Sequence, residues 1–573
     1  MLPTGALIRR LLLTTCLLAC GTQAAEVRTE GIDGELRRNV IAYIGPEEET
    51  GRMSYRALAR HAEEQARAAL QALGYYHPVI TVSREGREDK PVCVLRIEAG
   101  PPVLVRDVQV LLEGDRDPRE LGEFVALNRA HRGDVFHHGK YESFKTRLLQ
   151  QALMLGYFDA AWTRQQVRLD TDSNTADIEL SMALGARYKV GQTTIHGEGF
   201  EEGLIARFPR FRAGDWYDAG KMAELHRDLV RTGWFENVRI RAEPSDAVDL
   251  AVPVDIEYEP RKKNRIGIGA GFSTDIGPRV QLQWEKPWLN ARGHSLASYL
   301  EMSEVRSQFE ASYLVPLSDP VTSQLAYSYG VQMENLNDHD YWLTTAGIEH
   351  RKRLPSKWRL IRALDIERET DDFGEREISS TLLIPGVTFS RTDSDGVPLV
   401  TRGWRAIAHV QFASRDLLSD ADMLRGTLDA KVIHSLGERV RVIARGGVGA
   451  MATDDILDIP VSLRFYAGGD QSVRGYKYES IAPEDINGDL VGGRYRAETS
   501  IEFDWRFAER WLVAVFADRG TAFDDVSESD FVTGAGAGIR WLSPIGPLRL
   551  DFARGISEDD PPFNVHFYMG PEL

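Results

Sequence analysis

The sequence predicts three α/β repeats followed by a sixteen-stranded antiparallel transmembrane β-barrel. Two observations in the first half of the chain support the repeats. A glycine followed by two aromatic residues occurs three times, and each glycine ends a stretch with helical periodicity. One observation supports the barrel: after Pro260, extended segments of about ten residues follow one another, separated by turn residues.

The N-terminal segment, residues 1–25, has the pattern of a secretory signal peptide. Arg9 and Arg10 precede a short apolar run, and the small residues of "TQAAEV" follow it, which predicts cleavage near Ala24 or Ala25. The "LLAC" stretch that ends at Cys20 also resembles a lipoprotein cleavage box, so the type of signal peptidase stays open. We therefore expect an exported protein.

The cysteine count and the net charge narrow the class of protein. Cys16 and Cys20 lie in the signal peptide, so only Cys93 remains after cleavage and a disulfide framework is excluded. Cys93 stands in the strand-like "PVCVLRIEA", which predicts a buried structural thiol. The formal net charge of the chain is −17, and loss of the two arginines of the signal lowers it to −19. This acidity argues against nucleic-acid binding, which requires a basic face.

The three repeats share a glycine at the end of a predicted helix: Gly74 in "LGYY", Gly156 in "LGYF" and Gly233 in "TGWF". Glycine suits a helix end because it adopts positive φ at little cost, and we expect the aromatic residues after it to start an extended segment. Upstream of the first two glycines, apolar residues at matching offsets share one helical face. They are Ala62, Ala66, Leu70 and Leu73 in the first copy and Phe144, Leu148, Ala152 and Leu155 in the second.

The third copy keeps only Leu225 and Leu229 of this helical face. A second strand follows in every copy and is clearest in "TADIELSMA", where Ala176, Ile178 and the next two alternate residues are apolar between polar ones. The predicted repeats occupy residues 26–101, 102–186 and 187–260.

The region 261–573 is predicted to be the barrel. The mature chain has no uninterrupted apolar run of 18 residues, so a membrane helix is excluded, but alternating strands can cross a membrane without such a run. The clearest strand runs from Arg494 to Arg506, with polar residues at even positions and apolar residues at odd positions. One strand of this kind also fits a soluble sandwich, whereas a long series without a helix favours a membrane barrel.

Sixteen extended segments can be counted in this region, and an even number places both chain ends on the periplasmic side. A further candidate, "VSLRFYAG" (Val461–Gly468), would break this parity, so we assign it to one long excursion from about residue 454 to residue 493. The sixteen strands are predicted to start near Arg265, Arg279, Ser295, Ser307, Thr322, Asp340, Lys357, Ser379, Trp404, Met423, Arg439, Arg494, Trp511, Thr533, Gly546 and Asn564.

Four stretches of the predicted barrel carry a resemblance to a known family. They are "RFYAGGDQSVRGY" from Arg464, "FADRG" from Phe516, "GAGIRWLSPIGPLRLDFA" from Gly536 and the terminal "FNVHFYMGPEL". Together with the three repeats they resemble the outer-membrane assembly and translocation superfamily, whose members join periplasmic POTRA repeats to a sixteen-stranded barrel. Three repeats and the "GPEL" ending are most similar to the TamA family within it, since its relative BamA typically carries five repeats and two-partner secretion transporters carry two.

This resemblance implies a function and partners. The implied function is assistance to other proteins, autotransporters above all, as they enter the outer membrane of a Gram-negative bacterium. The implied partner is a TamB-like protein that is anchored in the inner membrane and spans the periplasm, and lipid traffic along that pair is also implied. No cofactor or metal is implied.

The resemblance also implies a site in the barrel lumen. The "VRGY" motif (Val473, Arg474, Gly475 and Tyr476) matches the segment of a long extracellular loop that folds back into the lumen in this superfamily. Arg474 can then meet a carboxylate on the inner wall, because an arginine fork holds a carboxylate by two hydrogen bonds. The strand register points two candidates inward, Glu502 and Asp518. A solvated loop arginine is the alternative.

The first and last strands are predicted to form a weak seam. The first strand, "RIGIGAGFS", carries Gly267, Gly269 and Gly271, and interior glycine weakens a strand. A poorly paired seam would offer an edge to an incoming client strand. The alternative is that these glycines only make room for the loop. The chain ends in Leu573 rather than in the aromatic residue common in barrel signals, so we expect Phe567 and Tyr568 of the last strand to take that role.

Other classes of protein have less support. The sequence shows no "GxSxG" elbow, "HExxH" pair or Walker loop, so an enzyme is not expected. A passive outer-membrane channel is the stronger alternative, although a channel does not need three periplasmic repeats, and a two-partner secretion transporter is a further one.

Overall fold

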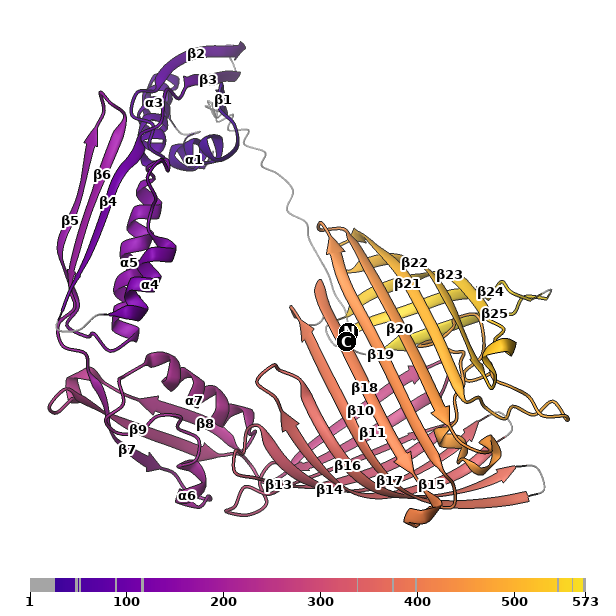
Figure 1. The fold of residues 1–573 in the computed structure, drawn as a ribbon. Coiled ribbons are helices and arrows are strands. Elements are labelled where there is room, and N and C mark those ends of the chain that lie inside the picture. Colours follow the sequence, from indigo (N-terminus) through magenta and orange to yellow (C-terminus); the bar gives the residue numbers. More distant parts are fainter. Residues whose placement is uncertain are drawn as a thin grey trace, which may run out of the picture. The chain divides into compact units, whose positions relative to one another are not determined.

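The computed structural model describes residues 26–46, 50, 53–87, 90–114, 118–336, 339–373, 376–396, 399–543, 546–558 and 560–569. The predicted signal peptide, with Cys16 and Cys20, lies outside these residues, as does the terminal "GPEL". The described chain forms three small α/β units followed by a closed barrel of sixteen antiparallel strands, which confirms the predicted fold class (Figure 1).

The described part of the first repeat has a three-stranded sheet and the helices α1 and α3. Strand order in its sheet is β1-β3-β2, with β1 parallel and β2 antiparallel to β3. Cys93 of β3 is a fully buried free thiol, as predicted, and burial raises its pKa. The predicted apolar face of the long helix, Ala62, Ala66 and Leu70, is fully buried. The elements are β1 (Glu26–Glu30), α1 (Gly34–Ile44), α3 (Tyr55–Ala72), β2 (Val79–Arg87) and β3 (Lys90–Glu98).

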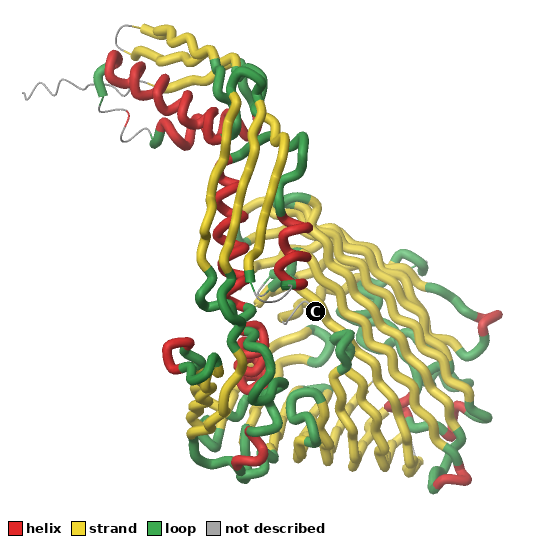
Figure 2. The backbone as a smooth tube through the Cα atoms, turned by 60° about the vertical axis from the view of Figure 1, so that its left-hand side comes forward, coloured by secondary structure: helices red, strands yellow, loops and turns green. Residues whose placement is uncertain are grey.

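The second repeat has the same order, β4-β6-β5, and its two helices lie on one face of the sheet (Figures 1 and 2). Burial alternates strictly along the strand predicted in "TADIELSMA", because Ala176, Ile178, Leu180 and Met182 face the helices. The elements are β4 (Leu104–Glu113), α4 (Arg119–Asn128), α5 (His138–Met154), β5 (Ala161–Asp170) and β6 (Thr175–Ala183).

The third repeat again has three strands, in the order β7-β9-β8. Leu225 and Leu229 are buried on its long helix, as the sequence pattern predicts. The elements are β7 (Lys189–His196), α6 (Glu202–Ile205), α7 (Ala219–Arg231), β8 (Phe235–Arg241), a 3-10 turn η1 (Pro244–Asp246) and β9 (Ala251–Pro260).

The shared glycines follow the long helices in all three repeats, with φ of 91° at Gly74, 86° at Gly156 and 72° at Gly233. The expectation that the aromatic residues start a strand is wrong for the first two copies, whose strands begin at Val79 and Ala161. The chain must first turn away from the helix end before it can join the sheet.

The second aromatic residue of each of the first two copies instead packs against the following repeat, whereas the first, Tyr75 or Tyr157, packs in the core of its own repeat. Tyr76 makes a hydrogen bond to His138 at 2.6 Å. The ring of Phe158 lies 5.1 Å from that of Tyr188 and 4.9 Å from that of Tyr217, centroid to centroid. The repeated corner therefore joins neighbouring units as well as ending a helix.

The barrel strands start within three residues of their predicted positions. Figure 2 shows strands throughout this region, with only short helical turns among the described residues. The strands are β10 (Arg265–Ser273), β11 (Gly277–Lys286), β12 (Ser295–Ser303), β13 (Arg306–Pro316), β14 (Ser323–Leu336), β15 (His339–Arg353), β16 (Arg359–Phe373), β17 (Arg376–Ser394), β18 (Arg402–Ala413), β19 (Met423–Leu436), β20 (Val440–Ala452), β21 (Tyr495–Ala508), β22 (Trp511–Phe523), β23 (Val532–Ser543), β24 (Gly546–Gly555) and β25 (Phe563–Met569).

The long excursion lies between β20 and β21, and we call residues 453–494 the lumen loop. Val461–Leu463, within the rejected seventeenth strand, is a 3-10 turn, so that segment is not a barrel strand. Along β21 the even-numbered Ser500, Glu502 and Asp504 are buried, whereas Ile501 and Phe503 are about half exposed on the outer face, as predicted. None of the helices in the described part of the chain is long and apolar enough to cross a membrane.

Candidate functional site: the lumen loop and the barrel wall

The lumen loop packs against inward-facing side chains of the barrel. Glu369 of β16 accepts a hydrogen bond from the backbone N–H of Val461 at 2.6 Å, and Arg425 of β19 donates to the carbonyl of Leu463 at 2.8 Å. The Arg425 guanidinium also lies 4.5 Å from the centroid of the Phe465 ring. These contacts hold the first part of the loop inside the barrel, and the "VRGY" motif that follows lies against β21, β22 and β24.

Arg474 is buried, with 4% of its surface exposed, and it contacts both carboxylates that the sequence singled out. Its Nε donates to Asp518 Oδ2 at 2.7 Å and its Nη2 donates to Asp518 Oδ1 at 2.9 Å, which is a two-pronged pair. Its Nη1 donates to Glu502 Oε2 at 2.6 Å. Arg474 is therefore not a solvated loop arginine.

Three further wall residues complete the arginine's surroundings, and the sequence argument missed the first two of them. Asp551 of β24 accepts from Arg474 Nη1 at 3.1 Å, and Ser500 of β21 accepts from Nη2 at 3.3 Å. The ring of Phe516, on the same face of β22 as Asp518, lies 3.4 Å from the guanidinium carbon, centroid to atom. The missed Asp551 could have been found from the alternation in "PLRLDFA", which points Arg549, Asp551 and Ala553 to one face.

Two other arginines balance the buried charge. Arg540 of β23, 1% exposed, donates to Glu502 Oε1 at 2.9 Å and also binds Asp551. Arg445 of β20 lies 3.7 Å from Asp518 and donates to the carbonyl of Ser472 at 2.6 Å. Each of the three carboxylates Glu502, Asp518 and Asp551 thus lies against two of the three arginines. Such pairing is required, because a buried unpaired charge is costly.

The other motif residues lie over glycines of the wall. Val473, Arg474 and Tyr476 are each buried. A Cβ added to Gly520 would lie 2.9 Å from the Val473 side chain, one added to Gly534 would collide with the Arg474 carbonyl oxygen, and one added to Gly555 would lie 2.7 Å from the Tyr476 ring.

Gly475 cannot be replaced without strain, since its φ is 100° and an added Cβ would lie 2.7 Å from the backbone of Arg554 and Gly555. Gly520 of "FADRG" and Gly534 of "VTGAGAGIR" therefore leave room for the loop to approach the wall. Gly536 and Gly538 of the same stretch instead make room for wall residues of the neighbouring strands, such as Phe516 and Asp551.

The seam between β10 and β25 has little direct pairing. Among the residues that the structure describes, the two strands are register partners only at Ser273 and Tyr568, whereas β10 pairs with β11 from Arg265 to Ser273. Thr274 N–H also donates to the Phe567 carbonyl at 3.3 Å. Phe567 further contacts Phe272, with ring centroids 5.8 Å apart.

The three seam glycines do not make room for the loop. A Cβ added to Gly267 or Gly269 would meet the side chain of Gln283 or Gln281 on β11, and one added to Gly271 would meet that of Arg279. None of these neighbours belongs to the lumen loop. The outer face of the same strand is apolar, with Ile268 81% exposed.

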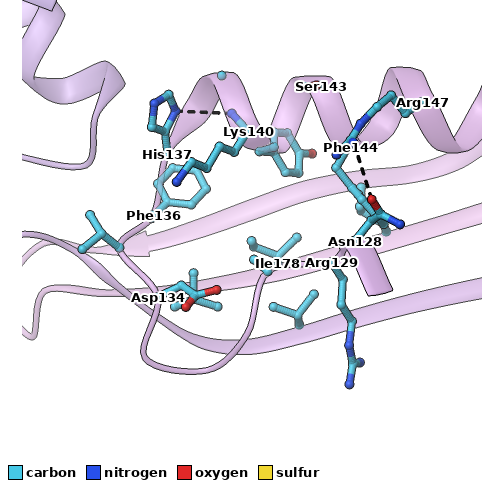
Figure 3. Close-up of a pocket in the computed structure, with 17 residues that line it drawn as sticks. Asn128, Arg129, Asp134, Phe136, His137, Lys140, Ser143, Phe144, Arg147 and Ile178 are labelled. Carbon is cyan, nitrogen blue, oxygen red and sulfur yellow. Dashed lines mark hydrogen bonds between the residues drawn. The ribbon is translucent and has the colours of Figure 1, made fainter. Parts of the chain in front are cut away.

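The second repeat contains a separate hollow of about 680 Å³ between α5, the segment after α4 and the sheet (Figure 3). Its apolar wall includes the core residues Phe136, Phe144 and Ile178, and Arg129, Lys140 and Arg147 stand at its rim. Arg147 donates to Asn128 at 3.4 Å. Within the described ranges, no group of three or more His, Cys, Asp or Glu side chains could hold a metal ion.

Comparison with known proteins identifies relatives for both the barrel and the first repeat. Residues 262–572 match the Omp85 superfamily domain, and residues 26–99 match the POTRA domain described as TamA domain 1. The chain is 25% identical to the outer membrane protein assembly factor BamA of Nitratidesulfovibrio vulgaris over 429 residues, which cover 70% of this chain and 53% of that protein. It is 21% identical to BamA of Neisseria meningitidis over 546 residues, covering 84% of this chain and 68% of that protein.

Among solved structures, BamA from Haemophilus ducreyi lacking POTRA domains 1–3 superposes with a TM-score of 0.65 at 17% identity. The match covers 81% of this chain and 99% of that chain, so the two share a fold. The chain spans about half the length of the first of the two BamA relatives.

Proposed function

The chain belongs to the Omp85 superfamily, and from this premise we propose that it is a TamA-like outer-membrane subunit of a translocation and assembly module. In this role it assists autotransporters and other client outer-membrane proteins as they insert into the outer membrane of a Gram-negative bacterium. Its repeats stand in the periplasm, where a TamB-like protein anchored in the inner membrane is the partner.

The seam is the observation that carries this proposal. Every other neighbouring pair of barrel strands forms a longer ladder among the described residues, whereas β10 and β25 have one register pair. A strand edge with unpaired N–H and C=O groups can accept a client strand by β-augmentation. Opening at this position would release the new strand sideways into the lipid.

Three repeats and the TamA-type first repeat favour this assignment over a BamA-like one. They also favour it over a two-partner secretion transporter, which carries two repeats. The buried lumen loop weighs against a passive channel, because Arg474 and its neighbours occupy the space that a solute would need.

The repeats are proposed to act as a docking arm. Each sheet has two outer strands, such as β4 and β5 in the second repeat, and an outer strand can pair with an extended segment of a partner or a client. Recovery of the TamB-like protein on immobilised full-length protein, and its loss when the repeats are removed, would support this role.

Locking the seam tests the proposal directly. Thr274→Cys with Phe567→Cys should form a disulfide, because these residues follow the single register pair and share a backbone hydrogen bond. The matched control is Ala406→Cys with Ala430→Cys, register partners on β18 and β19. Native Cys93 is fully buried and should not interfere.

We expect the oxidised seam pair to stop the assembly of an autotransporter client and a reductant to restore it, with no effect in the control pair. Client assembly at the normal rate with a complete seam disulfide would refute lateral opening.

A further inference from the structure

The lumen loop contacts both strands of the seam through a short segment, residues 470–475. On the first-strand side, Asp470 Oδ2 accepts a hydrogen bond from the hydroxyl of Ser273, the last residue of β10, at 3.0 Å. The backbone N–H of Asp470 donates to Asp275 Oδ2 at 2.7 Å. Both bonds reach the chain just where β10 ends and forms its single register pair with β25.

On the last-strand side, both backbone polar groups of Gly475 are bound by side chains of β25. Its N–H donates to Nε2 of His566 at 3.0 Å, and its carbonyl accepts from the amide of Asn564 at 2.6 Å. His566 is 4% exposed, so this bond is protected from water. Two residues on one strand thus hold a single loop residue in place.

His566 also connects the two sides of the seam. Since its Nε2 accepts a hydrogen bond from Gly475, the neutral ring carries its proton on Nδ1. That Nδ1 lies 3.7 Å from Asp275 Oδ1, beyond the end of β10. The path from β25 through His566 to Asp275 therefore spans the seam.

The loop adds polar contacts to this part of the seam, where the strands themselves are joined by the Ser273–Tyr568 register pair and by two hydrogen bonds between Thr274 and Phe567. Four hydrogen bonds link residues 470–475 to Ser273, Asp275, Asn564 and His566. The Arg474 side chain, in contrast, donates its hydrogen bonds to β21, β22 and β24. The segment therefore makes two separate sets of contacts: the Arg474 side chain binds the barrel wall, and Asp470 and Gly475 bind the seam.

We propose that Asp470 and Gly475, with their partners Ser273, Asp275, Asn564 and His566, form a latch that holds the seam closed. The Arg474 network fixes the loop on the wall, and the latch transmits the loop's position to β10 and β25. Release of the latch frees both seam strands at once. This inference rests on the proposed lateral opening, and its test is read at the seam itself.

The test measures the width of the seam in the full-length protein in phospholipid nanodiscs. Spin labels on Ile268→Cys of β10 and Val565→Cys of β25, both on the outer face, report the distance between the strands by pulsed electron paramagnetic resonance. The latch variants are Asn564→Ala alone and Asp470→Ala with Asn564→Ala. The matched control is Gln471→Ala, an exposed neighbour of Asp470 on the same loop.

We expect each lost hydrogen bond to raise the population of the wide-seam state about fivefold. Asn564→Ala should therefore give a moderate rise, the double variant a larger one, and Gln471→Ala none. The single variant also keeps the test valid if the double variant does not fold, since it removes one amide and no charge. Distance distributions in both latch variants that match those of the control and the unmodified protein would overturn the latch.

Seam width and client assembly, measured on the same variants, test the latch and the proposed lateral insertion separately. A wider seam with unchanged client assembly would support the latch and count against lateral insertion. An unchanged seam in the latch variants, combined with the block by the Thr274–Phe567 disulfide, would overturn the latch and leave lateral insertion standing.

Discussion

Asp518 accepts three hydrogen bonds from Arg474: one from the backbone N–H at 3.1 Å and two from the guanidinium at 2.7 and 2.9 Å. One carboxylate therefore fixes both the backbone and the side chain of the same loop residue. Because Asp518 is 1% exposed, water does not compete for these bonds. The pair determines where the loop lies, and its removal should affect the loop before it affects the barrel.

Arg474→Ala is expected to leave a barrel that assembles but works poorly. The substitution leaves Asp518 without its main cation and removes one of the two arginines that bind Glu502, and breaking a well-desolvated pair costs about 3 kcal/mol or more. The barrel wall keeps its strand ladders, so heat-modifiable migration in gels should persist, whereas protease should cleave the lumen loop faster. Arg519→Ala is the matched control, because Arg519 is exposed on the outer face next to Asp518. Normal activity and unchanged protease sensitivity of Arg474→Ala would show that the pair has no functional role.

Asp518→Asn should be more damaging than Asp551→Asn. Asp518 holds the loop backbone as well as the arginine, whereas Asp551 accepts one bond from Arg474 and shares Arg540 with Glu502. Protease sensitivity of the lumen loop in the two variants measures the difference. Equal sensitivity would mean that only the total negative charge of the network matters.

Gly534→Ala should displace the lumen loop, and Gly269→Ala should not. A Cβ at Gly534 would collide with the Arg474 carbonyl, and backbone cannot move aside cheaply. A Cβ at Gly269 would lie 3.2 Å from the flexible end of the Gln281 side chain, which can shift. Limited proteolysis of the loop should therefore report a change for Gly534→Ala alone. Release of the loop by Gly269→Ala would show that the seam glycines do accommodate it.

The sequence was sufficient to predict the barrel because strand alternation and turn residues are local signals. Each strand starts within three residues of its predicted position, and the parity of the count places Val461–Gly468 in the loop. The inward register of Glu502 and Asp518 follows from the same alternation. The strand predicted directly after Gly74 is wrong, since the position where a chain leaves a helix corner depends on the neighbouring repeat.

The remainder of the site depends on which strands face each other across the lumen. Arg540 and Asp551 lie on β23 and β24, and no local pattern pairs them with a loop residue about 70 positions earlier. The contacts of Asp470 and Gly475 to the seam have the same origin: they join residues that are 89 to 197 positions apart. Closure of the barrel, rather than any local propensity, brings these residues together.

Acid should weaken the contact between the first and second repeats at His138. Burial lowers the pKa of His138 below its ordinary value of 6.5; the Glu142 carboxylate opposes this shift, and the neighbouring His137 adds to it. The neutral ring is therefore favoured in the folded state, and the stability it contributes is full above about pH 6.5 and is lost as the pH falls through the lowered pKa.

Amide exchange in β2 and α5 should thus speed up between about pH 7.5 and pH 5.5, after correction for the intrinsic rate. His138→Gln should remove this added pH dependence, whereas His131→Gln, on an exposed loop, should keep it. The same pH dependence in the protein with His138→Gln would assign it to another group.

The corner glycines should differ in their tolerance of alanine, because only some of them touch the next unit. Gly233 has a φ of 72° and open space around an added Cβ, so Gly233→Ala should cost only the left-handed backbone strain of about 1–2 kcal/mol. Gly74 has a φ of 91°, and an added Cβ would also collide with the carbonyl oxygen of Phe136 in the second repeat. Gly74→Ala should therefore destabilise the corner more and expose the Tyr76–His138 contact.

Native-state amide exchange at the ends of α3 and α7 measures both effects in the full-length protein. A larger increase at α7 in Gly233→Ala than at α3 in Gly74→Ala would contradict the packing argument.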